Sequence, residues 1–140
     1  MKIRIQDNSI RFRVTLKEVE QFAESGLIER STQSIVPEGL GPVFKYSIVR
    51  DRNATESAVD ISGSSITFRL CEADREALLQ PAEEGVYLRR EWVSPEGKAF
   101  RFMAFVEKDR PGSTCIKKEQ WIYDVSSTGS IESRPIPQKK

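Results

Sequence analysis

The opening stretch Met1–Val14, MKIRIQDNSIRFRV, contains the pattern on which the fold depends. Apolar and charged residues alternate in both of its halves, which is typical of β-strands with one buried face. Asp7 and Asn8 separate the halves, and both residue types tolerate the positive φ of a tight turn. The stretch therefore predicts an antiparallel β-hairpin.

The same alternation predicts the register of this hairpin. A loop of two or four residues pairs Ile5 with Ile10 and Arg4 with Arg11, whereas an odd-length loop sets apolar residues against charged ones or requires a bulge. The predicted core face consists of Ile3, Ile5, Ile10, Phe12 and Val14. The opposite face carries the four cations Lys2, Arg4, Arg11 and Arg13. Opposed like charges cost up to about 1 kcal/mol per pair, so solvent, carboxylates or a bound anion must offset them.

A helix is predicted directly after the hairpin, over residues 16–24. Thr15 and Glu18 have the spacing of a capping box, and Gly26 suits the C-terminal cap. The apolar residues inside this segment recur at helical spacing, so one side of the helix is expected to pack on the core face of the hairpin.

Six further segments have strand patterns: 27–32, 43–50, 57–62, 65–70, 86–93 and 98–107. The Pro- and Gly-rich segment Ile35–Pro42 is predicted to be a loop. A second helix over 72–79 ends before Pro81, which cannot continue it. The two later hairpins have matched partners across their turns: Val59 with Phe68, Trp92 with Phe100, and Glu91 with Arg101.

Because the strands follow one another as hairpins, without regular alternation of strand and helix, the order predicts an α+β fold. We expect a curved antiparallel sheet or incomplete β-barrel of about eight strands with two helices, the first packed on the sheet. Residues 1–125 are expected to form a single domain, in which 120–125 is a late strand or anchor. Residues 126–140, rich in Ser, Pro and Lys, are expected to form a flexible tail. No internal repeat is evident.

The composition excludes several classes of protein. The net charge of +1 provides no general attraction to nucleic acid or membrane, and no apolar run approaches the roughly 20 residues of a membrane span. The first residues lack the apolar region of a signal peptide. Cys71 and Cys115 are too few for a disulfide framework, although a bridge between them stays open. A cytoplasmic protein is expected.

The chain contains no histidine. This absence removes Ser–His and Cys–His catalysis and every zinc site that uses histidine. Catalysis by carboxylates, Lys, Arg or Tyr, with or without magnesium, stays open, but a non-enzymatic role is favoured. No cofactor and no metal site are predicted.

The basic hairpin face is the first candidate site, because Arg binds phosphate or carboxylate with bidentate geometry. Glu107 and Asp109, at the end of a predicted core strand, are its candidate acidic partners, and carboxylates there could hold magnesium near a bound phosphate. The more common role of such a face is a solvated or salt-bridged surface. A stacking platform for bases is a further option for four aromatic residues, for which core packing is favoured: Trp92, Phe100, Phe102 and Phe105.

Three motifs carry a resemblance: the opening MKIRI, NSIRFRVT with the following LKEVEQF, and FVEKD at Phe105–Asp109. Together they resemble a small family of uncharacterised bacterial proteins with a similar basic hairpin, a helix after a Thr and a late EKD strand end. The resemblance covers about the first 110 residues. It implies a shared fold and assigns no catalytic residues.

These observations favour a small non-enzymatic binding or assembly domain, with a protein partner or a second copy of the chain. The alternative is an anion- or nucleotide-binding domain, or a magnesium-dependent phosphohydrolase, that uses the basic hairpin face. Direct binding of nucleic acid is disfavoured by the near-zero net charge.

Overall fold

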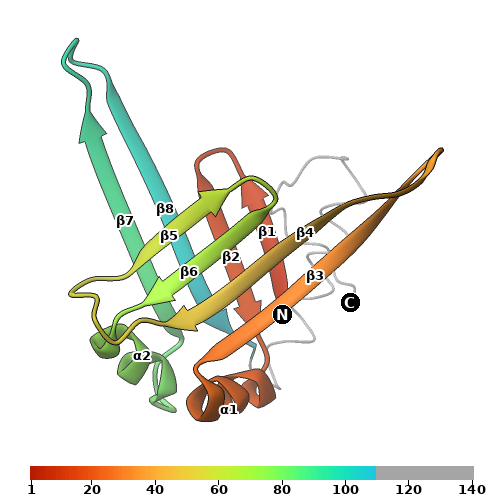
Figure 1. The fold of residues 1–140 in the computed structure, drawn as a ribbon. Helices are drawn as coiled ribbons and strands as arrows, with labels where there is room; N and C mark the ends of the chain where they lie inside the picture. Colours follow the sequence, from red (N-terminus) through yellow and green to blue (C-terminus); the bar gives the residue numbers. More distant parts are fainter. Residues whose placement is uncertain (110–140) are drawn as a thin grey trace, which may run out of the picture. The chain divides into compact units, whose positions relative to one another are not determined.

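Eight strands and two helices occur in residues 1–109, the part of the chain that the computed structural model describes (Figure 1). Their order is β1 (Lys2–Gln6), β2 (Ser9–Val14), α1 (Leu16–Ser25), β3 (Leu27–Val36), β4 (Gly39–Arg50), β5 (Ala58–Ser62), β6 (Ser65–Leu70), α2 (Glu72–Leu79), β7 (Gly85–Val93) and β8 (Ala99–Lys108). The predicted α+β class, with about eight strands and two helices, is confirmed. The predicted boundary at 125, the segment 120–125 and the tail 126–140 lie outside the described residues.

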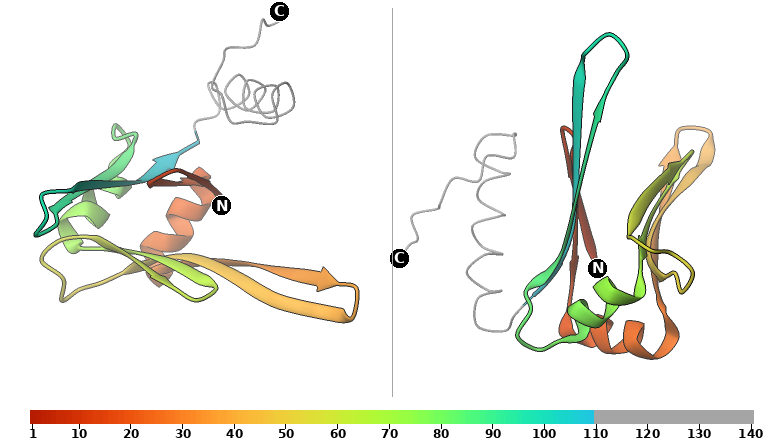
Figure 2. Two further views of the ribbon diagram at one scale, coloured as in Figure 1. Left: turned by 90° about the horizontal axis from the view of Figure 1, so that it is seen from above. Right: turned by 90° about the vertical axis from the view of Figure 1, so that its left-hand side faces the viewer.

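The strands form two four-stranded sheets that are not closed into a barrel (Figure 2). Sheet A has the order β1-β2-β8-β7, and sheet B has the order β3-β4-β6-β5. Each sheet consists of two antiparallel hairpins whose inner strands pair in parallel, β2 with β8 and β4 with β6. The sheets are therefore mixed, and the parallel pairs join strands far apart in the sequence.

All three predicted hairpin registers are confirmed. Ile5 lies opposite Ile10 in the first hairpin, and Asp7 in its turn has φ 52°. In the later hairpins the predicted partners also face each other: Val59 with Phe68, Trp92 with Phe100, and Glu91 with Arg101. Alternation and turn residues are thus sufficient to define these local pairings.

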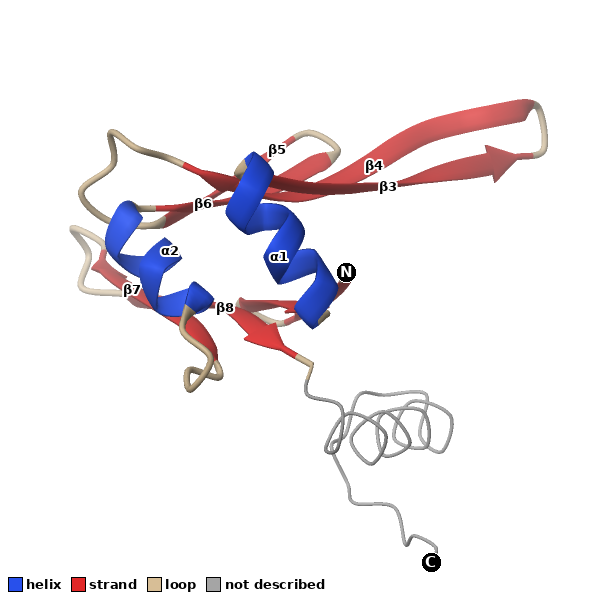
Figure 3. Cartoon of the chain, turned by 90° about the horizontal axis from the view of Figure 1, so that it is seen from below, coloured by secondary structure: helices blue, strands red, loops and turns tan. Residues whose placement is uncertain are grey.

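Helix α1 begins and ends where its capping residues predict. The Thr15 hydroxyl accepts a hydrogen bond from the Glu18 amide at 3.1 Å, and a Glu18 carboxylate oxygen accepts one from the Thr15 amide at 3.0 Å. Gly26 ends the helix with φ 76°, in the left-handed region. Both helices lie at the same end of the two sheets (Figure 3). Neither of these described helices is long and apolar enough to cross a membrane.

The prediction of a loop over Ile35–Pro42 is wrong, because β3 and β4 continue through most of this segment as a long hairpin. Pro42 is tolerated within β4 because the pairing of β4 with β6 begins only at Lys45. At Pro42, β4 therefore has no sheet neighbour on the side of β6. Proline is tolerated at such a position because no second strand requires a hydrogen bond from its missing amide hydrogen.

The two sheets are built from two copies of one ββαββ unit. The first copy comprises β1–β4 with α1, and the second comprises β5–β8 with α2. Each copy gives its first hairpin to one sheet and its second hairpin to the other. The parallel registers agree as well, because Phe12 lies opposite Val106 in sheet A, and its counterpart Phe68 lies opposite Ile48 in sheet B.

The sequence retains traces of this repeat, so the expectation that it contains none is wrong. Ser9–Arg13 reads SIRFR, and Ser65–Arg69 reads SITFR. The turn sequence Pro-Glu-Gly occurs at Pro37–Gly39 and again at Pro95–Gly97. These matches are short and widely separated, and the strand pairing of the structure is what relates them.

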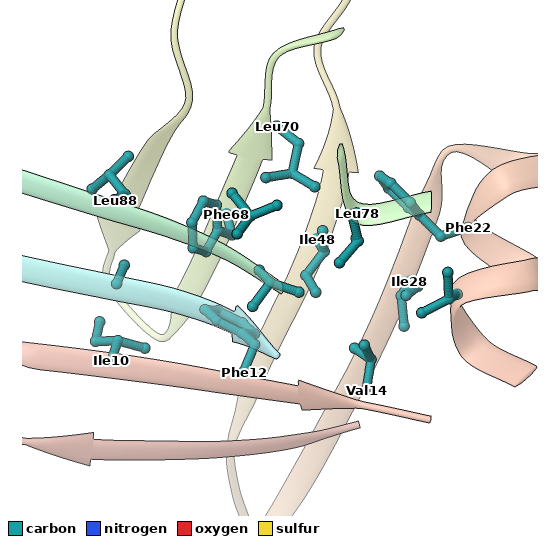
Figure 4. Packing of buried hydrophobic residues seen from close by; sticks show 14 of the residues in the cluster. Ile10, Phe12, Val14, Phe22, Ile28, Ile48, Phe68, Leu70, Leu78 and Leu88 are labelled. Atoms are coloured by element: carbon teal, nitrogen blue, oxygen red, sulfur yellow. The ribbon is translucent and has the colours of Figure 1, made fainter. Parts of the chain in front are cut away.

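The core lies between the two sheets and is closed by the helices at one end (Figure 4). Phe12 and Phe68 are fully buried at its centre, and their rings meet edge to face at 5.7 Å. Phe22 of α1 belongs to the same cluster. The predicted core face of the first hairpin is buried at Ile10, Phe12 and Val14, but Ile3 is half-buried and Ile5 is 53% exposed. The prediction that Ile5 packs in the core is therefore wrong, because Ile5 lies beside the β1–β2 turn, away from the helices.

Candidate functional site

The four predicted cations lie on the outer face of sheet A, which is the face opposite the core. Lys2 lies opposite Arg13, and Arg4 lies opposite Arg11, on β1 and β2. Because the two sheets of the described residues are not closed into a barrel, this basic face lies on the side of sheet A that faces away from sheet B.

Glu107 reaches the basic face through the parallel pairing of β2 with β8, which sets it opposite Arg13. Its Oε1 atom lies 3.3 Å from Arg11 Nε and 3.6 Å from Arg13 Nη2. One carboxylate thus serves two guanidinium groups. The structure brings Glu107 together with two of the predicted site residues, whereas Asp109 follows the end of β8 and is half-buried.

Two aromatic residues complete this face. Phe105 on β8 lies opposite Arg11, whose guanidinium carbon is 5.3 Å from the ring centroid. Tyr87 on β7 faces Phe105 edge-on at 5.5 Å and is 56% exposed. Burial, and then the negative charge of Glu107, raise the pKa of the Tyr87 hydroxyl. The sequence analysis missed Tyr87, although the predicted register of the third hairpin already places it opposite Phe105.

The equivalent face of sheet B has a different charge pattern. Asp60 stands at the position of Arg4, Thr67 at that of Arg11, and Arg69 at that of Arg13. Arg69 Nε lies 2.5 Å from Asp60 Oδ2, and Arg69 Nη1 lies 2.9 Å from Asp51 Oδ2. These contacts raise the pKa of Arg69 and hold the pKa of the Asp51 carboxyl below its usual range. Arg69, the counterpart of Arg13, therefore pairs with Asp60 of β5 and with Asp51, which directly follows β4.

Beyond the core, the inner faces of both sheets carry further apolar residues. Phe102 of β8 is half-buried, Phe100 is 42% exposed, and Trp92 of β7 is 59% exposed. On sheet B, the half-buried rings of Phe44 and Tyr46 lie 6.0 Å apart. The favoured prediction that Trp92 and Phe100 pack in the core is wrong, because the turn end of the β7–β8 hairpin extends away from the helices (Figure 2).

No group of three metal-ligating side chains occurs within residues 1–109. A cavity of about 390 Å³ lies beside the β1–β2 turn, and Asp7 and Arg101 are the ionisable residues among those that line it. Cys71 is buried at the start of α2, where its amide donates a hydrogen bond to the Ser57 hydroxyl at 3.0 Å. Cys115 lies outside the described residues, and so does the question of a bridge between the two cysteines.

Comparison with known proteins identifies a family. No curated protein and no solved structure matches this chain. The model of DUF7009, a family of unknown function, matches residues 1–130 and so extends beyond the segment that carries the resemblance. The expected relation to an uncharacterised family is thereby confirmed, and the chain belongs to the family DUF7009.

Proposed function

We propose that this protein is a non-enzymatic binding or assembly domain that docks a partner protein on the apolar inner faces of its two sheets. The observation that carries the proposal is the exposure of Trp92 and Phe100 on faces that continue the buried core. Contiguous exposed apolar surface of this kind marks interaction sites in soluble proteins.

Trp92 and Phe100 are suited to act as anchors in an interface. Their rings lie 5.5 Å apart on neighbouring strands, so each restricts the other before any partner arrives. Large aromatic side chains contribute much of the binding energy in protein interfaces, because they bury a large area and lose little conformational entropy.

The two copies of the repeat present a matched pair of apolar residues at the end of the inner faces that lies away from the helices. Ile5 of β1 and Ile61 of β5 occupy equivalent positions, and they are 53% and 63% exposed. This pattern supports a docking surface that both sheets share. We further propose, from the sequence alone, that the protein acts in the bacterial cytoplasm.

A pair of variants tests this function. Trp92→Ser with Phe100→Ser removes the aromatic pair, while Val93→Ser changes an equally exposed residue on the other face of the same hairpin. We expect wild type and Val93→Ser to self-associate in sedimentation experiments or to retain the same partner in affinity capture. The double variant should lose that association. A strictly monomeric wild type that retains no partner, or a double variant that behaves like wild type, would contradict the proposal.

A further inference from the structure

Four strands of the described chain lie at the edges of the sheets, and β3 differs from the other three. β1 and β7 are the edges of sheet A, and β3 and β5 are the edges of sheet B. β3 has ten residues, and its segment Ser31–Val36, STQSIV, contains no charge, proline or glycine. β1 and β5 have five residues each, and β7 carries the adjacent charges Arg89, Arg90 and Glu91. Short length and charge protect an edge against pairing, and the segment Ser31–Val36 lacks this protection.

The same segment belongs to the part of the β3–β4 hairpin that extends beyond the rest of sheet B (Figure 1). β4 pairs with β6 only from Lys45 onward, so this part of the hairpin is two-stranded within the described residues. Ile35 and Leu40 lie opposite each other there and are 79% and 77% exposed. A two-stranded hairpin alone is only marginally stable in water, so further strands would stabilise this one.

The backbone groups of alternate residues point to the free edge of β3. The Lys45 amide donates to the Ser64 carbonyl oxygen at 2.9 Å and so points toward β6. Ser31 lies opposite Lys45, and its own amide and carbonyl therefore point away from β4. Gln33 and Ile35 follow the same alternation. These groups can bond with a further strand.

Side chains cover only the first part of this edge. The Ser25 hydroxyl lies 3.2 Å from the Leu27 amide nitrogen and 3.0 Å from the Leu27 carbonyl oxygen. Arg30 Nη1 donates to the Glu29 carbonyl oxygen at 2.8 Å. From Ser31 onward, the edge of β3 has neither a strand neighbour nor a covering side chain of this kind within residues 1–109.

We propose that β3 pairs antiparallel with β3 of a second copy of the chain, so that the two B sheets form one continuous sheet. With the twofold axis at Thr32, this residue faces its own copy, which is a favourable cross-strand pair. Ser31 then faces Gln33 of the second copy, and Ile28 faces Val36 of the second copy. The two charged residues of β3 face uncharged residues in this register. The inference goes beyond the function proposed above, because it concerns the edge of sheet B and not the inner faces.

The charge pattern of β3 suits a second copy of the same chain. A twofold interface sets the residue on its axis against itself. Thr32 and both of its neighbours are uncharged, so an axis at the middle of β3 opposes no like charges. The central residues of β7 are Arg89, Arg90 and Glu91, so a twofold pairing of that longer edge of sheet A would oppose like charges, which is destabilising.

Charges introduced at the facing positions test the pairing. Ser31→Lys with Gln33→Lys sets lysines against each other across the axis, and Ser31→Glu with Gln33→Glu does the same with glutamates. We expect wild type to sediment as a dimer of the 15.9 kDa chain, and each double variant to dimerise about tenfold or more weakly. An equal mixture of the two double variants should recover the dimer, because each lysine then faces a glutamate.

The matched control is Ser62→Lys, at an exposed residue of β5 on the other edge of sheet B, and it should sediment like wild type. Circular dichroism confirms that each variant is folded.

A cysteine at the axis tests the register. Cys71 is buried, and Cys115→Ser removes the other native thiol. In that background, Thr32→Cys should form a disulfide-linked dimer on oxidation, because facing Cα atoms of a non-hydrogen-bonded pair lie about 4.5 Å apart, within the range of a disulfide. Ser62→Cys in the same background is the control and should stay unlinked.

Pairing at β3 and docking on the inner faces are measured separately. In Trp92→Ser with Phe100→Ser, the β3 dimer should persist, and only an association made by the inner faces, such as a captured partner or a larger assembly, should be lost. A dimer lost in this variant would assign self-association to the inner faces and overturn the inference. A monomeric wild type, a dimer that the paired lysines do not weaken, or an unlinked Thr32→Cys would overturn it as well.

Discussion

Phe12 and Phe68 occupy equivalent positions in the two copies of the repeat, and their fully buried rings meet edge to face at 5.7 Å. Each ring belongs to a different sheet, so their contact joins the two sheets at the centre of the core.

Replacing either ring should therefore have the same large effect. We expect Phe12→Ala and Phe68→Ala each to lower the free energy of unfolding by about 3–5 kcal/mol, the usual cost of deleting a buried Phe side chain. Guanidinium denaturation measures this change. Ile61→Ala, at a residue that is 63% exposed, is the control and should cost less than about 0.5 kcal/mol. A Phe variant no less stable than this control would contradict the central role of the pair.

Glu18 predicts a pH dependence of stability. Its carboxylate is 7% exposed and contacts the amino group of Met1 at 2.5 Å and Arg30 Nη2 at 2.6 Å. Burial alone would raise its pKa, but the hydrogen bonds from the Met1 amino group and the Thr15 amide, with the charges of Met1 and Arg30, lower it below the ordinary value of 4.5. A lowered pKa means that the stabilisation is complete above the unfolded-state pKa and is lost as the pH falls through the folded-state pKa.

We expect Glu18→Gln to destabilise the protein by about 2 kcal/mol at pH 7, because hydrogen bonds to a charged group are lost. The difference in unfolding free energy between wild type and variant should shrink as the pH falls below 4.5. Denaturation curves at pH 7 and at pH 3 measure both quantities. A difference that is the same at both values would show that the charge of Glu18 is unimportant.

Gly85 is predicted to tolerate no side chain. A Cβ atom at this position would lie 2.1 Å from the carbonyl oxygen of Val106 and 3.0 Å from the Cα of Glu107, both backbone atoms of the paired strand β8. Gly85→Ala should therefore push β7 away from β8 and cost about 1–3 kcal/mol, the range for overpacking. The measurement is thermal unfolding by circular dichroism, and an unchanged melting temperature would argue against this close approach.

Lys108 and Arg50 occupy equivalent positions in the repeat but differ in their surroundings. Lys108 is 8% exposed, and its ammonium group donates to the carbonyl oxygens of Leu78 and Gln80 at 3.0 Å and 2.7 Å, at the end of α2. Arg50 forms a partly exposed ion pair with Glu72 at 2.6 Å.

We expect Lys108→Met to lower the free energy of unfolding by about 2–3 kcal/mol, because a buried and a partly buried carbonyl group lose a charged donor. Arg50→Met should cost less than about 1 kcal/mol, as is usual for ion pairs near the surface. Urea denaturation of both variants under the same conditions makes the comparison. Equal losses of unfolding free energy in the two variants would show that the burial of Lys108 does not make its contacts more stabilising than those of Arg50.

Local features of this fold were predictable from the sequence, and the long-range pairing was not. The capping box at Thr15 and the turns at Asp7 and Gly97 act over a few residues, so they define α1 and the hairpins correctly. The pairing of β2 with β8 joins segments about ninety residues apart, and no local pattern specifies it. The contact of Glu107 with Arg11 and Arg13 depends on that pairing, so the sequence suggested the partners without their geometry.

Exposure was the least predictable property. Trp92, Phe100 and Ile5 alternate with polar neighbours as core residues do, and the pattern correctly assigns them to the inner faces. Whether an inner face is covered depends on how far the helices reach along it, which the alternation does not record. The charge difference between the sheets became visible only when the structure related Arg4 to Asp60.

The exchange of hairpins between the two copies has a consequence for the order of folding during synthesis. All strands of sheet B lie within residues 27–70, so this sheet is complete in sequence well before the chain ends. Sheet A needs β1 and β2 from the beginning together with β7 and β8, which the ribosome delivers about ninety residues later. The first hairpin therefore lacks its sheet neighbour β8 until residues 99–108 have been synthesised, and an unpaired strand edge of this kind is prone to aggregation.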